Sequence, residues 1–123
     1  MVNQRVFSSR QHFQATSTPA EEPVRSVVTE SVDCTVVAWH VLPGQAISSH
    51  VHPEGTDVWT VLEGSGDYVL GQVAGEEFPS RRINPGDVAV ARPGEVHGVL
   101  NRGAVPLRFI SVVTPLTAGY QPV

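Results

Sequence analysis

Residues 44–64 read GQAISSHVHPEGTDVWTVLEG, a pattern typical of paired β-strands. Two segments rich in β-branched and aromatic residues, 47–51 and 57–63, lie on either side of a turn with the sequence PEG. His50 and His52 lie at the end of the first segment, on either side of its last residue, and residues two apart in a strand point to the same side. The stretch therefore predicts two strands joined by a tight turn, with both imidazoles facing one point.

Similar short segments recur on both sides of this stretch, separated by turns rich in Pro and Gly. Eight strands are expected, at residues 24–29, 35–42, 47–51, 57–63, 66–73, 88–91, 96–101 and 107–113. No window carries an apolar stripe at helical spacing, because Pro or Gly interrupts nearly every candidate. Many short strands at regular spacing indicate an all-β sandwich or barrel.

Length and composition favour a single domain with one core. The chain has 123 residues, and although it contains 11 Gly and 10 Pro, 41% of the residues are hydrophobic, which argues against disorder. We expect a polar N-terminal arm over residues 1–23 with at most a short helical turn, a barrel over 24–114 and a loose C-terminal tail over 115–123.

Charge and hydropathy limit which kinds of partner the protein is expected to bind and in which compartment it is expected. The formal net charge is −4, with 12 acidic and 8 basic residues and no run of three basic residues, so nucleic acid is not expected as a partner. Apolar runs fall well short of the roughly 20 residues of a membrane span. The single Cys34 excludes an intramolecular disulfide, and without an apolar leader at the start of the sequence we expect a cytoplasmic protein.

A third histidine extends the pair into a candidate metal site. The turn after His52 can return the Asp57 carboxylate to the histidines, and His97 follows another tight turn at the start of a predicted strand. Three imidazoles and one carboxylate suit Fe, Mn, Co, Ni, Cu or Zn. A lone His-x-His is more often structural, so the interpretation depends on the residues around it.

The surrounding residues resemble the two motifs of the cupin superfamily. The first motif, G(x)5HxH(x)3,4E(x)6G, is similar to the run Gly44-(x5)-His50-x-His52-(x4)-Asp57-(x6)-Gly64, in which Asp57 stands at the usual Glu position. The second, G(x)5PxG(x)2H(x)3N, is similar to the run Gly86-(x5)-Arg92-x-Gly94-(x2)-His97-(x3)-Asn101, in which Arg92 stands at the Pro position. The match is specific enough to predict a fold.

The resemblance implies a single-domain jelly-roll β-barrel, also called a double-stranded β-helix, with one divalent first-row transition metal inside it. Carried over by position, the metal ligands are His50, His52, Asp57 and His97. Asp is one methylene shorter than Glu, so Asp57 either binds the ion directly or orients a ligand. No catalytic residue is assigned.

Strand alternation selects the residues expected to wall a substrate pocket. Trp59 and Val61 share the face of Asp57, and Val99 shares the face of His97. Trp59 would offer a ring for a planar substrate, and Arg92 a guanidinium for a carboxylate. Core packing and a solvated surface position are the alternatives for these side chains.

Three functions remain open from the sequence. The first is a metalloenzyme with oxygenase, isomerase or lyase chemistry on a small organic substrate; the second is a non-catalytic binding or sensor protein; the third is a barrel with a vestigial metal site. Cupins of this size commonly pair through sheet edges, so we also expect a homodimer.

Overall fold

The computed structural model describes residues 4–71 and 79–123, and these residues form one short 3-10 helix and ten strands. The helix, η1, spans Ser9–Gln11. The strands are β1 (Arg25–Glu30), β2 (Thr35–Val41), β3 (Ala46–Val51), β4 (Thr56–Glu63), β5 (Gly66–Val69), β6 (Ser80–Ile83), β7 (Val88–Ala91), β8 (His97–Leu100), β9 (Leu107–Thr114) and β10 (Gln121–Pro122). None of the described helices is long and apolar enough to cross a membrane.

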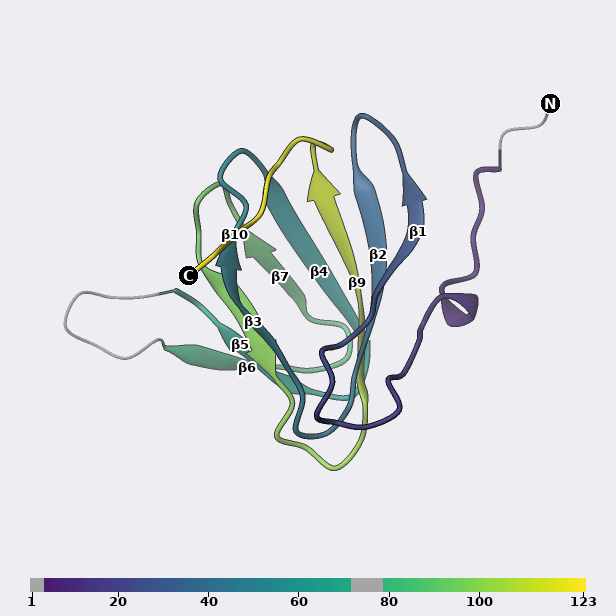
Figure 1. Ribbon diagram of the computed structural model, residues 1–123, viewed down its shortest axis with the longest axis vertical. Coiled ribbons are helices and arrows are strands. Elements are labelled where there is room, and N and C mark those ends of the chain that lie inside the picture. The colour runs from purple at the N-terminus through teal and green to yellow at the C-terminus, as the bar shows by residue number, and fades with distance from the viewer. Residues whose placement is uncertain (1–3, 72–78) are drawn as a thin grey trace.

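Two antiparallel sheets face each other, one with the strand order β1-β2-β9-β4-β7 and the other with β10-β3-β8-β5-β6 (Figure 1). Apart from the pairs β1–β2 and β5–β6, consecutive strands change sheet, so β3 and β4, which flank the PEG turn, lie in opposite sheets. Side chains on the inner faces of both sheets therefore meet in one interior. The prediction of an all-β jelly-roll barrel is confirmed.

The observed strands follow the predicted ones closely, with two additions. The segment 88–91 is β7 without change, whereas the expected strand 66–73 ends at Val69, and its last two residues lie outside the described part of the chain. β6 and β10 were not expected. β10 is only two residues long, too short to show a pattern of its own.

A compact hydrophobic core fills one end of the interior. Trp59 and Phe109 stack at its centre with ring centroids 4.1 Å apart. The buried members of this cluster are Val41, Trp59, Val61, Tyr68, Ile83, Ala89, Val99, Leu107 and Phe109. Asn101 closes the turn at this end, because its amide donates to the carbonyl groups of Val41 and Val105.

The C-terminal residues cover the opposite end of the interior, where a loose tail was expected. Gln121 pairs with Val51 of β3, and the backbone N–H of Glu54 donates to the Ala118 carbonyl at 2.9 Å. Gly55 makes this contact possible, since a Cβ on it would collide with Ala118. The tail is thus held by backbone pairing and by a close approach that only glycine permits.

Candidate metal centre

The two sheets bring the four predicted ligands together between them. His50 of β3 lies directly opposite His97 of β8, with ring centroids 4.2 Å apart, and His52 follows two residues later. Asp57 reaches the same place from β4 in the other sheet. One nitrogen of each histidine and one oxygen of Asp57 all lie within 4.8 Å of one another.

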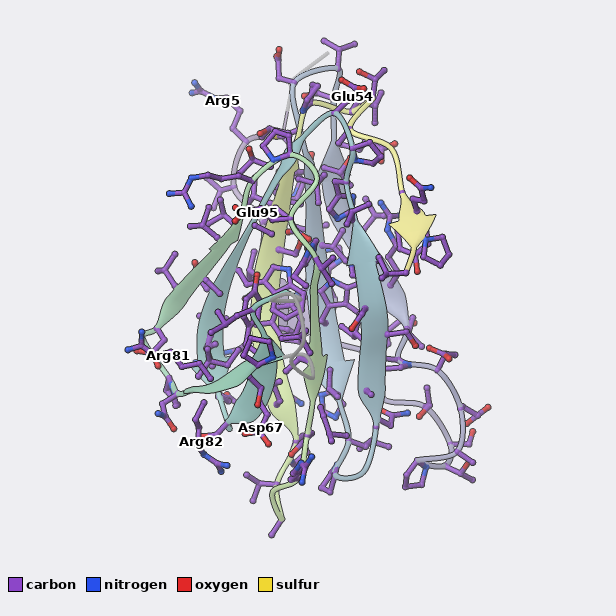
Figure 2. All side chains as sticks on the ribbon, turned by 90° about the vertical axis from the view of Figure 1, so that its left-hand side faces the viewer. Arg5, Glu54, Asp67, Arg81, Arg82 and Glu95 are labelled. Carbon is purple, nitrogen blue, oxygen red and sulfur yellow. The ribbon has the colours of Figure 1, made fainter. Side chains whose placement is uncertain are left out.

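The turns that carry these residues meet at the same end of the barrel. Glu54 lies in the turn between His52 and Asp57, and Glu95 lies in the turn before His97. Both side chains are labelled toward the upper end of Figure 2. The N–H of Gly94 donates to the His52 carbonyl at 3.0 Å, which ties the two turns together. The ligand positions are therefore fixed to each other through the backbone.

Each histidine is held by a hydrogen bond from Nδ1 to a backbone carbonyl. His50 bonds to Ser48 at 2.7 Å, His52 to Gly119 at 2.7 Å and His97 to Glu95 at 3.1 Å. Because a carbonyl can only accept, Nδ1 carries the proton in each ring, and Nε2 of a neutral ring carries the free lone pair. The same arrangement orients metal-binding histidines in general.

Asp57 joins this cluster through both carboxylate oxygens. Oδ1 accepts a hydrogen bond from the Ser111 hydroxyl at 2.6 Å. Oδ2 lies 3.2 Å from Nε2 of His52 and 3.0 Å from Nε2 of His97. With Nδ1 protonated, two neutral imidazoles would turn lone pairs toward the same anionic oxygen, which is repulsive unless a proton or a cation lies among them.

The pKa shifts of Asp57 and His50 suit cation binding. Burial favours a higher pKa for Asp57, but the contacts with His52 and His97 and the hydrogen bond from Ser111 outweigh it and hold the pKa of this carboxyl well below its usual range. Burial lowers the pKa of His50 to about 4. Burial also opposes protonation of His52, but the contacts with Asp57 and the Gly119 carbonyl outweigh it and raise its pKa. Asp57 is thus ionised and His50 neutral, as metal ligands must be.

This donor set fits a divalent first-row metal ion. Imidazole nitrogen and carboxylate oxygen are borderline ligands that bind several such ions. Ligand atoms about 2.1 Å from an ion have neighbouring ligand atoms roughly 3.0–3.4 Å away. The 3.0 and 3.2 Å separations around Oδ2 match that spacing, so Asp57 fits the position of a direct ligand.

A cavity of about 680 Å³ lies between the sheets beside this cluster. His50, His52 and Asp57 line it, whereas His97 is fully buried behind them. Its remaining walls come from the residues before β1, from β1, β2, β3, β4 and β9, and from the C-terminal residues. They are Glu22, Pro23, Arg25, Thr35, Val37, Trp39, Ile47, Ser48, Trp59, Ser111, Val113, Leu116, Ala118, Gly119 and Tyr120. The volume is suited to a small organic molecule.

Three of the predicted pocket residues point inward but differ in depth. Trp59 lines the cavity, yet it is only 1% exposed and one face stacks on Phe109, so packing occupies much of the ring. Val61 and Val99 are each 1% exposed and belong to the core cluster rather than to the cavity wall. Alternation identified the correct side of these strands but not how far along the interior each residue lies.

The fourth predicted pocket residue, Arg92, lies at an exposed turn and does not line the cavity. Its N–H donates to the Glu95 carboxylate at 2.8 Å, and its guanidinium lies 3.7 Å from the same carboxylate. This local pairing holds Arg92 on the surface. The arginine that does line the cavity is Arg25, which the sequence motifs do not include.

Three further residues at the centre were not singled out from the sequence. Ser111 is a polar residue in the apolar strand LRFISVVT, and this was the one available signal. Gly119 supplies the carbonyl that holds His52 across 67 residues, and the Tyr120 ring lies 4.9 Å from the His50 ring. Neither Gly119 nor Tyr120 stands in a recognisable motif.

Comparison with known proteins identifies the family. Residues 37–113 match the family model described as the cupin domain. Over 74 residues, the chain is 35% identical to Germin-like protein 4-1 of Oryza sativa subsp. japonica, covering 57% of this chain and 29% of that protein. Over 74 residues, it is also 31% identical to the tetracenomycin polyketide synthase protein TcmJ of Streptomyces glaucescens, covering 60% of this chain and 46% of that protein. The chain thus spans less than half the length of these relatives.

A solved structure resembles the chain over nearly its whole length. It is a conserved protein with a double-stranded β-helix domain from Klebsiella pneumoniae subsp. pneumoniae MGH 78578, with 43% identity, a TM-score of 0.88 and 98% of both chains covered. The two sheets, the clustered histidines and the family-model match all agree. This chain belongs to the cupin family.

Proposed function

We propose that this protein is a metalloenzyme that holds one divalent first-row ion through His50, His52, Asp57 and His97 and acts on a small organic molecule in the adjoining cavity. The carrying observation is the contact of two Nε2 atoms, on His52 and His97, with the single oxygen Oδ2 of ionised Asp57. The lone pairs of the two nitrogens and the negative charge of the carboxylate repel one another. A cation bound among these atoms is attracted by all three, so the cluster favours a bound cation.

The bound ion would supply Lewis-acid chemistry, polarising an oxygen of the substrate. The chain supplies the rest of the environment. His50, His52 and Asp57 approach from the cavity side, and four protein ligands leave further positions open in an octahedral ion. Val37, Ile47 and Val113 give the cavity apolar walls that hold a small substrate and exclude water. Oxygenation, isomerisation and lyase chemistry are all compatible with this environment.

A non-catalytic binding or sensor role is the second candidate. The observation that favours it is the composition of the cavity wall: apart from the ligands, its titratable side chains are Glu22, Arg25 and Tyr120. Among the described residues, none of these three side chains forms a hydrogen bond with His50, His52, Asp57 or His97. A vestigial site is less consistent with the structure, because all three histidines keep their orienting carbonyl partners.

Cobalt substitution tests whether the ion has open positions that face the cavity. We expect the Co²⁺-loaded protein to show visible absorption bands that shift when azide is added, because azide can enter a vacant coordination position. The double variant His50→Ala, His97→Ala should show neither the bands nor the shift. A wild-type cobalt spectrum that does not respond to azide would rule out the enzymatic proposal, since no position would remain for a substrate.

A further inference from the structure

Arg25 lines the cavity from the edge of a sheet, where its side chain is also exposed to solvent. It is the first residue of β1, and it pairs with Trp39 of β2. Trp39 in turn pairs with Phe109 of β9, which is fully buried in the core. Directly opposite residues of an antiparallel pair share a face, so Arg25 lies on the inner side of its sheet and lines the cavity.

The guanidinium of Arg25 has no partner among residues 4–71 and 79–123, where it forms neither a hydrogen bond nor an ion pair. Four other arginines each lie within 4 Å of a carboxylate, namely Arg82, Arg92, Arg102 and Arg108. Glu22 also lines the cavity but is not within ion-pair distance of Arg25. The donors of Arg25 are thus not taken up by a neighbouring side chain of the described residues, and they remain available to a ligand at this wall of the cavity.

The charges around the cavity favour an anion. With the proposed divalent ion bound and the histidines neutral, the ion and Arg25 together outweigh the carboxylates of Asp57 and Glu22. Apolar side chains form much of the cavity wall, among them Val37, Trp39, Ile47 and Val113. A ligand with an anionic group and an apolar body matches both features.

Resting on the proposed function, we propose that Arg25 is a specificity-determining residue that binds a carboxylate of the substrate at one end of the cavity, while the rest of the molecule extends toward the metal ligands. The planar fork of arginine matches a carboxylate in two parallel hydrogen bonds. The substrate class is therefore a small carboxylic acid with an alkyl or aryl body.

A purely structural role is the competing explanation for Arg25. Inward-pointing charges on edge strands can prevent unwanted pairing of a sheet with another chain. In that case the guanidinium would affect self-association and have no preference for carboxylates. The two explanations therefore predict different responses of the same variant.

Calorimetric titration with matched acids and amides tests the proposal. The probes are hexanoate and 3-phenylpropanoate, each compared with its primary amide, on metal-loaded and on metal-stripped protein. We expect at least one acid to bind the wild type about tenfold more tightly than its amide, and Arg25→Gln to remove that preference. Arg92→Gln, a change at an exposed arginine outside the cavity, should keep it.

Equal binding of acid and amide by the wild type, including no binding of either, would overturn the proposal. So would a preference that Arg25→Gln retains, with or without increased self-association in light scattering. Metal content measured on the same samples separates this result from the proposed function. A carboxylate preference in metal-free protein that Arg25→Gln abolishes supports the subsite even if the protein binds no metal.

Discussion

Asp57→Asn is expected to lower the affinity for a divalent metal ion by at least about 100-fold while leaving the fold intact. Losing a residue that only orients a ligand typically costs 10–100-fold, and Asp57 both orients ligands and supplies a negative charge. Asn keeps the shape and can still meet Ser111, so the change isolates the charge. Competition with a chromophoric chelator measures the affinity, and circular dichroism checks the fold.

Two further variants make this test specific. Asp67→Asn removes a carboxylate at the other end of the barrel, where Asp67 pairs with Arg82 and Arg102, and should leave the metal affinity unchanged (Figure 2). Asp57→Glu, which installs the residue typical of the family motif, should keep most of the affinity. An Asp57→Asn protein that binds metal within twofold of the wild type would show that the carboxylate is not a ligand.

Deletion of residues 117–123 is expected to weaken metal binding about 10–100-fold, the range found when a partner that orients a metal-binding histidine is lost. The deletion removes the Gly119 carbonyl that holds Nδ1 of His52 at 2.7 Å and the Tyr120 ring that packs against His50. His52 would then lose its fixed tautomer and orientation. Chelator competition gives the affinity, and thermal unfolding shows whether the shortened chain still folds.

A pair of glycine variants separates this effect from a general loss of stability. Gly119 and Gly86 both adopt positive φ angles, +81° and +91°, so alanine strains the backbone at either position. Only Gly119 carries the carbonyl bound to His52. Gly119→Ala should reduce metal affinity, and Gly86→Ala should lower stability alone. Equal metal affinities in these two variants and in the deletion protein would contradict the proposed role of the C-terminal residues.

The fold and the metal cluster could be predicted because their signals are local. Alternation places His50 and His52 on one side of a strand, and the tight turns in PEG and RPGE set where Asp57 and His97 begin their own strands. Each of these steps spans only a few residues. The pairing of β3 with β8 joins distant parts of the sequence and does not follow from local patterns. The resemblance to the two cupin motifs is what predicts that His97 lies beside His50 and His52.

The rest of the site depends on strand register and on depth within the interior, which a single sequence does not encode. Arg25 lines the cavity because it pairs with Trp39 across β1 and β2, and nothing near it in the sequence marks that pairing. Gly119 reaches His52 only because a two-residue strand, β10, joins the edge of β3. Val61 has the predicted orientation but lies in the core.

The interior is divided between a hydrophobic core and a cluster of buried polar groups. Aromatic and aliphatic side chains pack one end around Trp59 and Phe109. The other end contains buried polar groups whose partners lie on both sheets, including Asp57 and His97. A buried ionised group requires such partners, so the rigid core is what holds the ligands at fixed positions.

Metal content of the purified, untagged protein, expressed with several metals available, tests the central claim most directly. Elemental analysis should find about one first-row divalent ion per chain, and the double variant His50→Ala, His97→Ala should have lost it. A folded wild-type protein that contains no metal and takes up none on reconstitution would contradict the assignment of His50, His52, Asp57 and His97 as a metal centre.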